Sequence, residues 1–544
     1  MSNYKGFSTV ELSRPTRSRF DLSHERRMST RMGKLTPVFI SETLPNDTFN
    51  VNTEVLLRLA PLLAPIMHRV NVFVHFFFVP NRLLWEDWEE FITAGRLGED
   101  SPVPPRAGWF NTLDEGANLL DKGSLADYLG IPNIPDADVD DWEPGVNDPG
   151  FFDLMPFASY YKVWYDYYRD RNFVADNENL PLTSGTQSGI VPELLAIKNR
   201  SWQHDYFTSA LPWTQRGAEV LMPLEGTGTV NYLGTSIVKT TAGANVTSNT
   251  LLGTMVSGAP GTLIIDKDNA ADPGNTGRIE NISDVDITNS NVSINDLRRA
   301  VRLQEWLERN ALAGSRYNES IMAHFGRKTS DARLQRAEYL GGGKVVVKIN
   351  EVVTTAYSQD ATDTTVPPAN MSGHGISFGE TNRFSYNCEE HGFVIGIMSV
   401  MPTSGYMQGL PRMFSNRSTF LDYPWPSFAH LGEQEVYNSE IFLDPATAKQ
   451  LTSGAQSLFG YQSRYSDWKH ISSSSHGDFR SSLDFWHLTR KFEDLPVLGA
   501  EFNTFEDELQ DRIFAVSGVD TLWCYIYNDI SVKRSLPYFG TPKL

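Results

Sequence analysis

The stretch "RVNVFVHFFFVP", residues 69–80, decides the fold class of this chain. Its β-branched and aromatic density is typical of a strand, and from Phe76 onward apolar residues occupy both faces. We therefore expect a strand that is covered on both sides. Similar strand patterns recur at 344–356, 392–401 and 513–527, separated by proline, glycine and asparagine turns. Short, spaced strands of this kind predict an all-β sandwich.

Helices are predicted only as insertions into this β scaffold. One follows the first strand in "NRLLWEDWEEFITAG" (81–95), and a longer one lies in "SINDLRRAVRLQEWLERNALAG" (293–314). In the longer segment Ser293 and Asp296 fit a capping signal, and apolar residues recur at helical spacing. Strands and helices do not alternate along the chain, so a doubly wound nucleotide-binding fold is disfavoured.

Composition narrows the classes of protein further. The 544 residues contain 40% hydrophobic residues, enough for a sizeable core. No apolar run reaches the roughly 18 residues needed to cross a bilayer, and the N-terminus lacks the apolar stretch of a signal peptide, so we expect a protein made in a cytoplasm without membrane insertion. Cys388 and Cys524, the two cysteines, are too few for a disulfide framework and are expected to be reduced and buried.

Charge is distributed unevenly along the chain. A formal net charge of -19 argues against a general nucleic-acid binder, because phosphate would be repelled over most of the surface. Residues 1–35, however, carry eight lysines and arginines against three acidic residues. A basic N-terminal arm therefore precedes an acidic body.

The glycine-rich stretch "AHFGRKTSDARLQRAEYLGGGKVVVK", residues 323–348, invites comparison with a phosphate-binding loop. Such loops place glycine amides between a strand and a helix N-terminus, where the helix dipole favours an anion. Here the glycines at 341–343 follow a helical pattern and precede a strand pattern. We interpret them as a helix stop that leads into a strand.

Two segments have the composition of surface excursions. Residues 225–291 are rich in threonine, glycine, asparagine and serine, with Tyr232 the only aromatic, and predict a large insertion with small strands of its own or, alternatively, a flexible linker. Residues 131–153 form an aspartate- and proline-rich loop. Its carboxylates lack the glycine and terminal glutamate of an EF-hand, so a solvated acidic loop is favoured over a calcium site.

The sequence contains no recognisable catalytic motif. The 11 histidines form no HExxH, and no G-x-S-x-G elbow occurs, so we expect no catalytic, cofactor-binding or metal-binding residues and no cofactor. A β-sandwich carbohydrate-binding or carbohydrate-active protein with two carboxylates stays open as an alternative. The neighbouring Glu389 and Glu390 would point to opposite faces of a strand and could not converge.

Four segments together resemble one family: "RVNVFVHFFFVPNRLLW" (69–85), "NALAGSRYNESIMAHFGRKTSDARLQRAEYLGGGKV" (310–345), "LPRMFSNRSTFLDYPWPSFAHLGEQEVYNSEIF" (410–442) and "FGYQSRYSDWKHISSSSHGDFRSSLDFWHLTRKF" (459–492). They are similar to the major capsid proteins of the Microviridae, particularly the gokushovirus-like members. The resemblance covers most of the chain outside 100–155 and 225–290.

This resemblance implies one eight-stranded antiparallel jelly roll enlarged by loops and helices, in sixty copies forming a T=1 shell around a circular single-stranded DNA bacteriophage genome. The expected organisation is a basic arm at 1–40, a first part of the jelly roll at 41–224, a Thr/Gly-rich insertion at 225–291, and the remainder of the jelly roll with the C-terminal tail at 292–544. The insertion corresponds in position to a protrusion at the threefold axes, for which host attachment is a hypothesis.

The resemblance also implies partners: the DNA genome, a small basic DNA-packaging protein, a scaffolding protein, a DNA pilot protein and a host surface receptor, with assembly in the bacterial cytoplasm. Basic residues near both ends of the chain are the expected phosphate contacts: Arg14, Arg17, Arg19, Arg26, Arg27, Arg31, Lys533, Arg534 and Lys543. Aromatic side chains beside them are expected to stack on bases: Phe7, Phe20, Tyr538 and Phe539. Alternatively, the arm clamps neighbouring subunits through ion pairs.

Overall fold

The computed structural model describes residues 16–539, except for 97, 98, 100, 109–120, 133–150, 176–179, 188, 219, 221–228, 240–277, 287–293, 314–315, 354–357, 360–364, 367–370, 382, 455 and 517. Residues 215–310 form one compact unit, and the rest of the chain forms another. The acidic loop predicted at 131–153 lies mostly outside the described residues.

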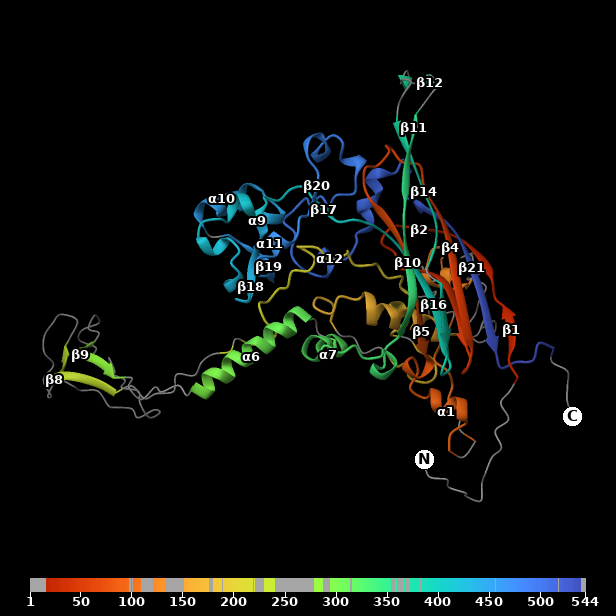
Figure 1. Cartoon of the computed structure of the whole chain (residues 1–544), viewed down its shortest axis with the longest axis horizontal. Coiled ribbons are helices and arrows are strands. Elements are labelled where there is room, and N and C mark those ends of the chain that lie inside the picture. The colour runs from red at the N-terminus through yellow and green to blue at the C-terminus, as the bar shows by residue number, and fades with distance from the viewer. Residues whose placement is uncertain are drawn as a thin grey trace, which may run out of the picture. The chain divides into compact units, whose positions relative to one another are not determined.

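The larger unit is built around two antiparallel sheets (Figure 1). The first is seven-stranded and contains β1 (Ser18–Asp21), β2 (His24–Thr30), β4 (Thr48–Leu59), β11 (Lys348–Val353), β14 (Met371–Glu380), β15 (Phe384–Asn387) and β21 (Leu522–Arg534). Its order is β1-β21-β4-β14-β11, with β2 also pairing with β21 and β15 with β4. The second is four-stranded, in the order β10 (Glu338–Val346), β5 (Val70–Pro80), β16 (Gly392–Pro402) and β3 (Thr36–Thr43).

The four-stranded sheet lies at the centre of the unit, because both of its faces are buried. On β5, Val74 and Phe76 belong to the core shared with the seven-stranded sheet, whereas Phe77 and Val79 belong to a second core. The second core includes residues of three helices: α3 (Leu125–Leu129), α4 (Met155–Val163) and α5 (Val191–Leu195). Every residue of β16 is buried. The expected double coverage of the 69–80 strand is therefore confirmed.

The seven-stranded sheet, in contrast, buries one face only. Along β21 the residues alternate, with Leu522, Ile526 and Val532 fully buried and Trp523 and Lys533 exposed. This period of two is the pattern of a strand with one face on the core and one on solvent. The exposed face is available to a partner.

Two sequence interpretations need correction. The strand expected at 513–527 begins only at Leu522, because Asp507–Ile513 form the 3-10 helix η9 and a turn separates the two elements. The glycines at 341–343 do not stop a helix before a strand but lie inside β10, whose register shifts between Tyr339 and Gly341. Gly342 packs so closely on β5 that a Cβ there would lie 2.4 Å from the carbonyl oxygen of Val74. Position 342 therefore requires glycine because there is no room for a side chain, and not because the chain turns there.

The helices expected as insertions are present in part. The 81–95 segment contains the 3-10 helix η1 (Asn81–Leu83) and α1 (Trp88–Thr93), and α6 spans Ile294–Ala313. In the smaller unit, β8 (Thr229–Lys239) pairs with β9 (Arg278–Asp286) in an antiparallel hairpin, as expected for an insertion with strands of its own. Cys388 and Cys524 are free and buried, as predicted. Across the described residues, no helix is long and apolar enough for a membrane span.

Candidate nucleic-acid interface

The two basic clusters at the ends of the chain lie on neighbouring strands. β1 pairs antiparallel with the end of β21, so that Arg19 lies opposite Lys533 and Phe20 opposite Val532. Opposite residues of an antiparallel pair share a face of the sheet. Since Val532 is fully buried, Arg19 and Lys533 project from the other, exposed face. Among the described residues neither side chain makes a hydrogen bond or ion pair, so both charges are free to meet phosphate.

Aromatic rings pack against the same strand pair. Phe20, which the register places on the opposite face of β1 from Arg19, stacks on Tyr538 with ring centroids 5.9 Å apart and planes 9° from parallel, and Tyr538 meets Phe539 edge-on at 4.9 Å. Tyr538 and Phe539 remain 65% and 79% exposed. Exposed rings are one of the elements on which single-stranded DNA can stack.

Arg17 and Arg27 are two further exposed candidates, and the exposed carboxylates of Asp21 and Asp529 lie on the part of this face between Arg19 and Arg27. Arg17 donates to the carbonyl oxygen of Asn46 at 2.5 Å and to that of Lys533 at 3.2 Å, which ties the start of the chain to its end. Arg27 lies opposite Tyr525 in the β2–β21 register and over its ring at 5.9 Å. It also pairs with Glu25, but its side chain stays 75% exposed, so this ion pair is weak and screened by solvent.

The other described candidates hold the subunit together. Arg26 donates to the carbonyl oxygen of Tyr128 at 2.8 Å, and burial lowers its pKa. Arg31 pairs with Asp511 at 2.5 Å, and Arg534 pairs at 2.8 Å with Asp47, whose side chain is fully buried. Since these contacts use the guanidinium donors, fewer are left for phosphate. Arg14, Lys543 and Phe7 lie outside the described residues.

Two further basic residues lie elsewhere on the seven-stranded sheet, away from the Arg19–Lys533 pair. Arg58 on β4 lies opposite Trp523 of β21, and Lys348 on β11 lies opposite Ile376 of β14. Both are exposed. Arg58 could have been found from the alternation in "TFNVNTEVLLRL", which places it on the face away from the core.

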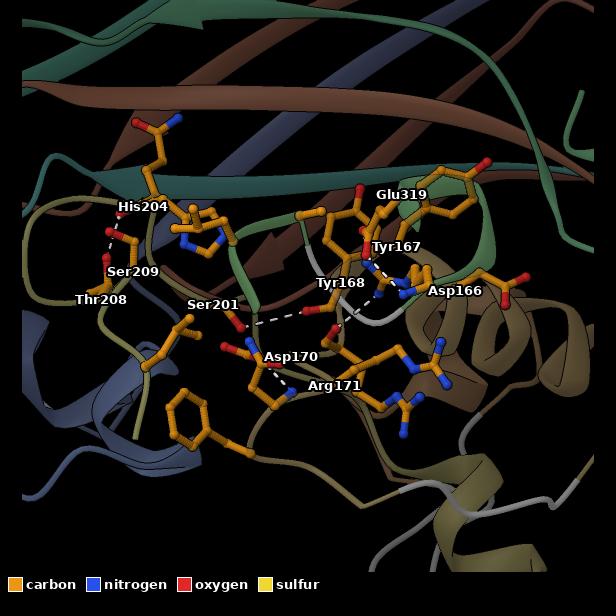
Figure 2. A pocket seen from close by; sticks show the side chains of 18 of the residues that line it. Asp166, Tyr167, Tyr168, Asp170, Arg171, Ser201, His204, Thr208, Ser209 and Glu319 are labelled. Atoms are coloured by element: carbon orange, nitrogen blue, oxygen red, sulfur yellow. Dashed lines mark hydrogen bonds and ion pairs between the residues drawn. The ribbon is translucent and has the colours of Figure 1, made fainter. Parts of the chain in front are cut away.

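A cavity of about 1090 Å³ opens beside the four-stranded sheet (Figure 2). Its lining carries charges of both signs that are paired within the chain: Arg336 donates to the carbonyl oxygen of Asp166 at 2.8 Å and lies 3.5 Å from a carboxylate oxygen of Asp331. A hydrogen bond of 2.8 Å joins Nδ1 of His75 to the hydroxyl of Tyr168. Burial, and then the charge of Arg200, lowers the pKa of His75 to about 4.

In the part of the chain that the structure describes, no three side chains of histidine, cysteine, aspartate or glutamate come together as metal ligands, in this cavity or elsewhere. Outside the cavity, Glu390, one of the two carboxylates considered for glycoside chemistry, forms a 2.8 Å ion pair with Arg82. This carboxylate is therefore engaged within the chain.

Comparison with known proteins decides between the remaining classes. The model of the family "Capsid protein (F protein)" matches residues 8–544. This chain belongs to that capsid protein family. It is a structural protein of a bacteriophage particle and not an enzyme, which removes the carbohydrate-active alternative.

Relatives of this capsid protein match over nearly their whole length. Capsid protein VP1 of Chlamydia phage 1 is 34% identical, with 99% of this chain and 97% of the relative covered. Capsid protein VP1 of Bdellovibrio phage phiMH2K is 33% identical over 92% and 90% of the two chains. Capsid protein VP1 of Spiroplasma virus 4 is 28% identical over 99% and 97%. The resemblance to Microviridae capsid proteins in the four sequence segments is thereby confirmed.

Proposed function

We propose that this capsid protein assembles as sixty copies into a T=1 icosahedral shell that encloses a circular single-stranded DNA genome. Membership of the capsid family supports the shell. The observation that carries the DNA contact is the register of Arg19 opposite Lys533, which joins the basic clusters of both chain ends on one exposed face. A positive patch on an otherwise acidic protein can bind phosphate on the inner side of a shell while the rest of the surface repels free nucleic acid.

The strand order supports an eight-stranded jelly roll as the building block. The path β2-β21-β4-β14 in one sheet faces β3-β16-β5-β10 in the other, and successive strands change sheets from β2 to β3, from β3 to β4 and from β4 to β5. Such a wedge is stiff because its two sheets share one core, while its connecting loops are free to make contacts.

Genome contacts are proposed to fall into two groups. Arg19, Arg27 and Lys533 bind phosphate directly, and the rings of Phe20, Tyr538 and Phe539 stack on bases. Arg17, Arg26, Arg31 and Arg534 contribute mainly by their positive field, because their donors are engaged within the chain. Arg14 and Lys543 are also proposed to bind phosphate, and Phe7 to stack on a base; these three residues lie outside the described part of the chain.

Further partners follow from the family likeness: a scaffolding protein, a DNA pilot protein, a small basic DNA-packaging protein and a host receptor. We propose that the 225–291 insertion forms the threefold protrusion and attaches to the host. Its support is the separate β8–β9 hairpin, which shares no sheet with the larger unit.

Negative-stain electron microscopy of the purified protein, expressed alone and with neighbouring viral genes, tests the proposed shell. The expected result is uniform icosahedral particles that protect single-stranded DNA from nuclease. A protein that stays monomeric under every condition would overturn the shell, and particles that never protect DNA would overturn the genome contact alone.

A further inference from the structure

A group of exposed aromatic rings lies far from the basic face in sequence. Phe420 is 65% exposed, and Tyr423, Trp425 and Trp468 are each 51% exposed. The group is continuous: indole Nε1 of Trp425 donates to the carbonyl oxygen of Phe420 at 3.0 Å, and the rings of Tyr423 and Trp468 lie 6.2 Å apart. We call these four residues the aromatic patch. Exposed apolar clusters of this kind mark interaction sites.

The patch is held rigid by a dense local network. The carboxylate of Asp422 accepts hydrogen bonds from the backbone amides of Thr419 at 2.6 Å and Ser418 at 2.8 Å. Burial pushes the pKa of Asp422 up, but these bonds outweigh it and hold the pKa below its ordinary value. The hydroxyl of Tyr465 donates to the carbonyl oxygen of Leu421 at 3.3 Å. Rings fixed before binding lose little conformational entropy when a partner covers them.

Two of the arginines beside the patch are paired within the chain. Arg417 pairs with Asp467 and lies over the Trp468 ring at 5.1 Å, and Arg412 pairs with the buried Glu440 at 3.3 Å. Preorganised aromatic rings with arginines packed beside them are typical of a protein interface.

The amino-acid composition around the patch also favours a protein partner. Residues 410–431 contain six aromatic or methionine side chains and two arginines, with no lysine and no glutamate. Aromatic residues, methionine and arginine are enriched at protein interfaces, whereas lysine and glutamate are depleted. Because the chain is a capsid protein, the protein available in sixtyfold excess at this surface is another copy of itself.

We propose that the aromatic patch is an anchor of the contact between neighbouring copies of this chain in the shell. The inference rests on the proposed shell. Within it, the rings of the patch insert into the surface of the adjacent subunit and are excluded from solvent on assembly.

Phe420→Ala tests the patch, with Phe325→Ala as its control, since Phe325 is an even more exposed phenylalanine at 81%. Assembly is followed by light scattering against protein concentration, and unfolding midpoints verify that both variants fold. F420A is expected to raise the concentration for half-maximal assembly about tenfold, the effect of one lost interface anchor, while F325A stays close to wild type. Equal assembly of F420A and wild type would overturn the inference.

Hydrogen exchange of residues 411–431 separates the possible occupants. Slower exchange in empty shells than in dissociated subunits is expected if a second copy covers the patch. Slower exchange only in DNA-filled shells would assign the patch to the genome and overturn the proposal. Wild-type protein that forms no shell at all would overturn the proposed function, and the inference with it.

Discussion

Arg19 lies directly opposite Lys533 in the β1–β21 pair, so that the first and last strands of this capsid protein present their charges on one exposed face. Neither basic cluster would be sufficient alone, because each contributes few free cations. Their pairing brings two unpaired cations together on a protein of net charge -19.

Removing this pair should weaken DNA binding in a salt-dependent manner. For the double variant Arg19→Gln and Lys533→Gln, we expect the slope of log affinity for single-stranded DNA against log salt to fall by about 1.4, because two phosphate contacts release fewer counterions. Fluorescence anisotropy with an oligonucleotide measures this slope. Lys449→Gln, an exposed lysine on α10 (Pro445–Ser453), is the control. Equal slopes for both variants would contradict the assignment.

Adjacent basic residues should differ in what they stabilise. Arg534→Met removes the partner of the buried Asp47 carboxylate and should lower the free energy of unfolding by about 2 kcal/mol, less than for a fully buried pair because Arg534 is 21% exposed. Lys533→Met, at an exposed position, should change it by less than about 0.5 kcal/mol. Urea unfolding compares the two. A larger loss for Lys533→Met would show that the ion pair is not structural.

Close packing at Gly342 predicts intolerance of any side chain. Gly342→Ala should lower the free energy of unfolding by about 1–3 kcal/mol, because a Cβ would lie 2.4 Å from the carbonyl oxygen of Val74 and β10 would have to move away from β5. Gly189→Ala, where a Cβ meets nothing within 4 Å, is the matched control. The thermal unfolding midpoints of the two variants test this prediction, and similar midpoints would refute the packing argument.

Acid should destabilise the subunit through His75. Burial holds the pKa of His75 at about 4, so between pH 6.5 and 4 the unfolded chain binds a proton that the folded chain does not. The free energy of unfolding should therefore fall as the pH falls through this range. His75→Gln should reduce this dependence without abolishing it, because burial also lowers the pKa of His68 to about 4. Urea midpoints measured from pH 7 to pH 4 test this, and parallel curves for His75→Gln and wild type would count against it.

Replacing residues 225–291 with a flexible linker should spare the shell. Among the described residues, β8 and β9 pair with each other and with no strand of the larger unit's sheets, so those sheets lose no strand partner. Particles are expected by electron microscopy, while adsorption to the host is lost. Normal infection by such particles would dispose of the attachment hypothesis.

The sequence predicted the strands of the four-stranded sheet well and the start of β21 less well. The 69–80 and 392–401 segments are apolar on both faces, and both lie in the four-stranded sheet, which is covered on both faces. The 513–527 segment was wrong at its start, since local apolar density does not reveal where a 3-10 helix ends and pairing begins. The periodicity of apolar residues shows which faces of a strand are buried, but it does not show which strand pairs with it.

The candidate interface shows the same limit. Basic residues at both chain ends were found from composition, but their meeting depends on the pairing of β1 with β21, which no local pattern encodes. Nor could the sequence separate Arg534, paired with buried Asp47, from the free Lys533 next to it. Exposure of neighbouring side chains is decided by tertiary packing alone.

The position of β21 also bears on when the subunit can fold. This strand lies between β2 and β4, so the seven-stranded sheet stays divided until residues 522–534 have left the ribosome. Pairing of such distant segments is slow, since a long loop must close first. A chain cut short during translation would lack the strand that joins the two halves of the sheet. The seven-stranded sheet is thus expected to close only after the last described strand has been synthesised.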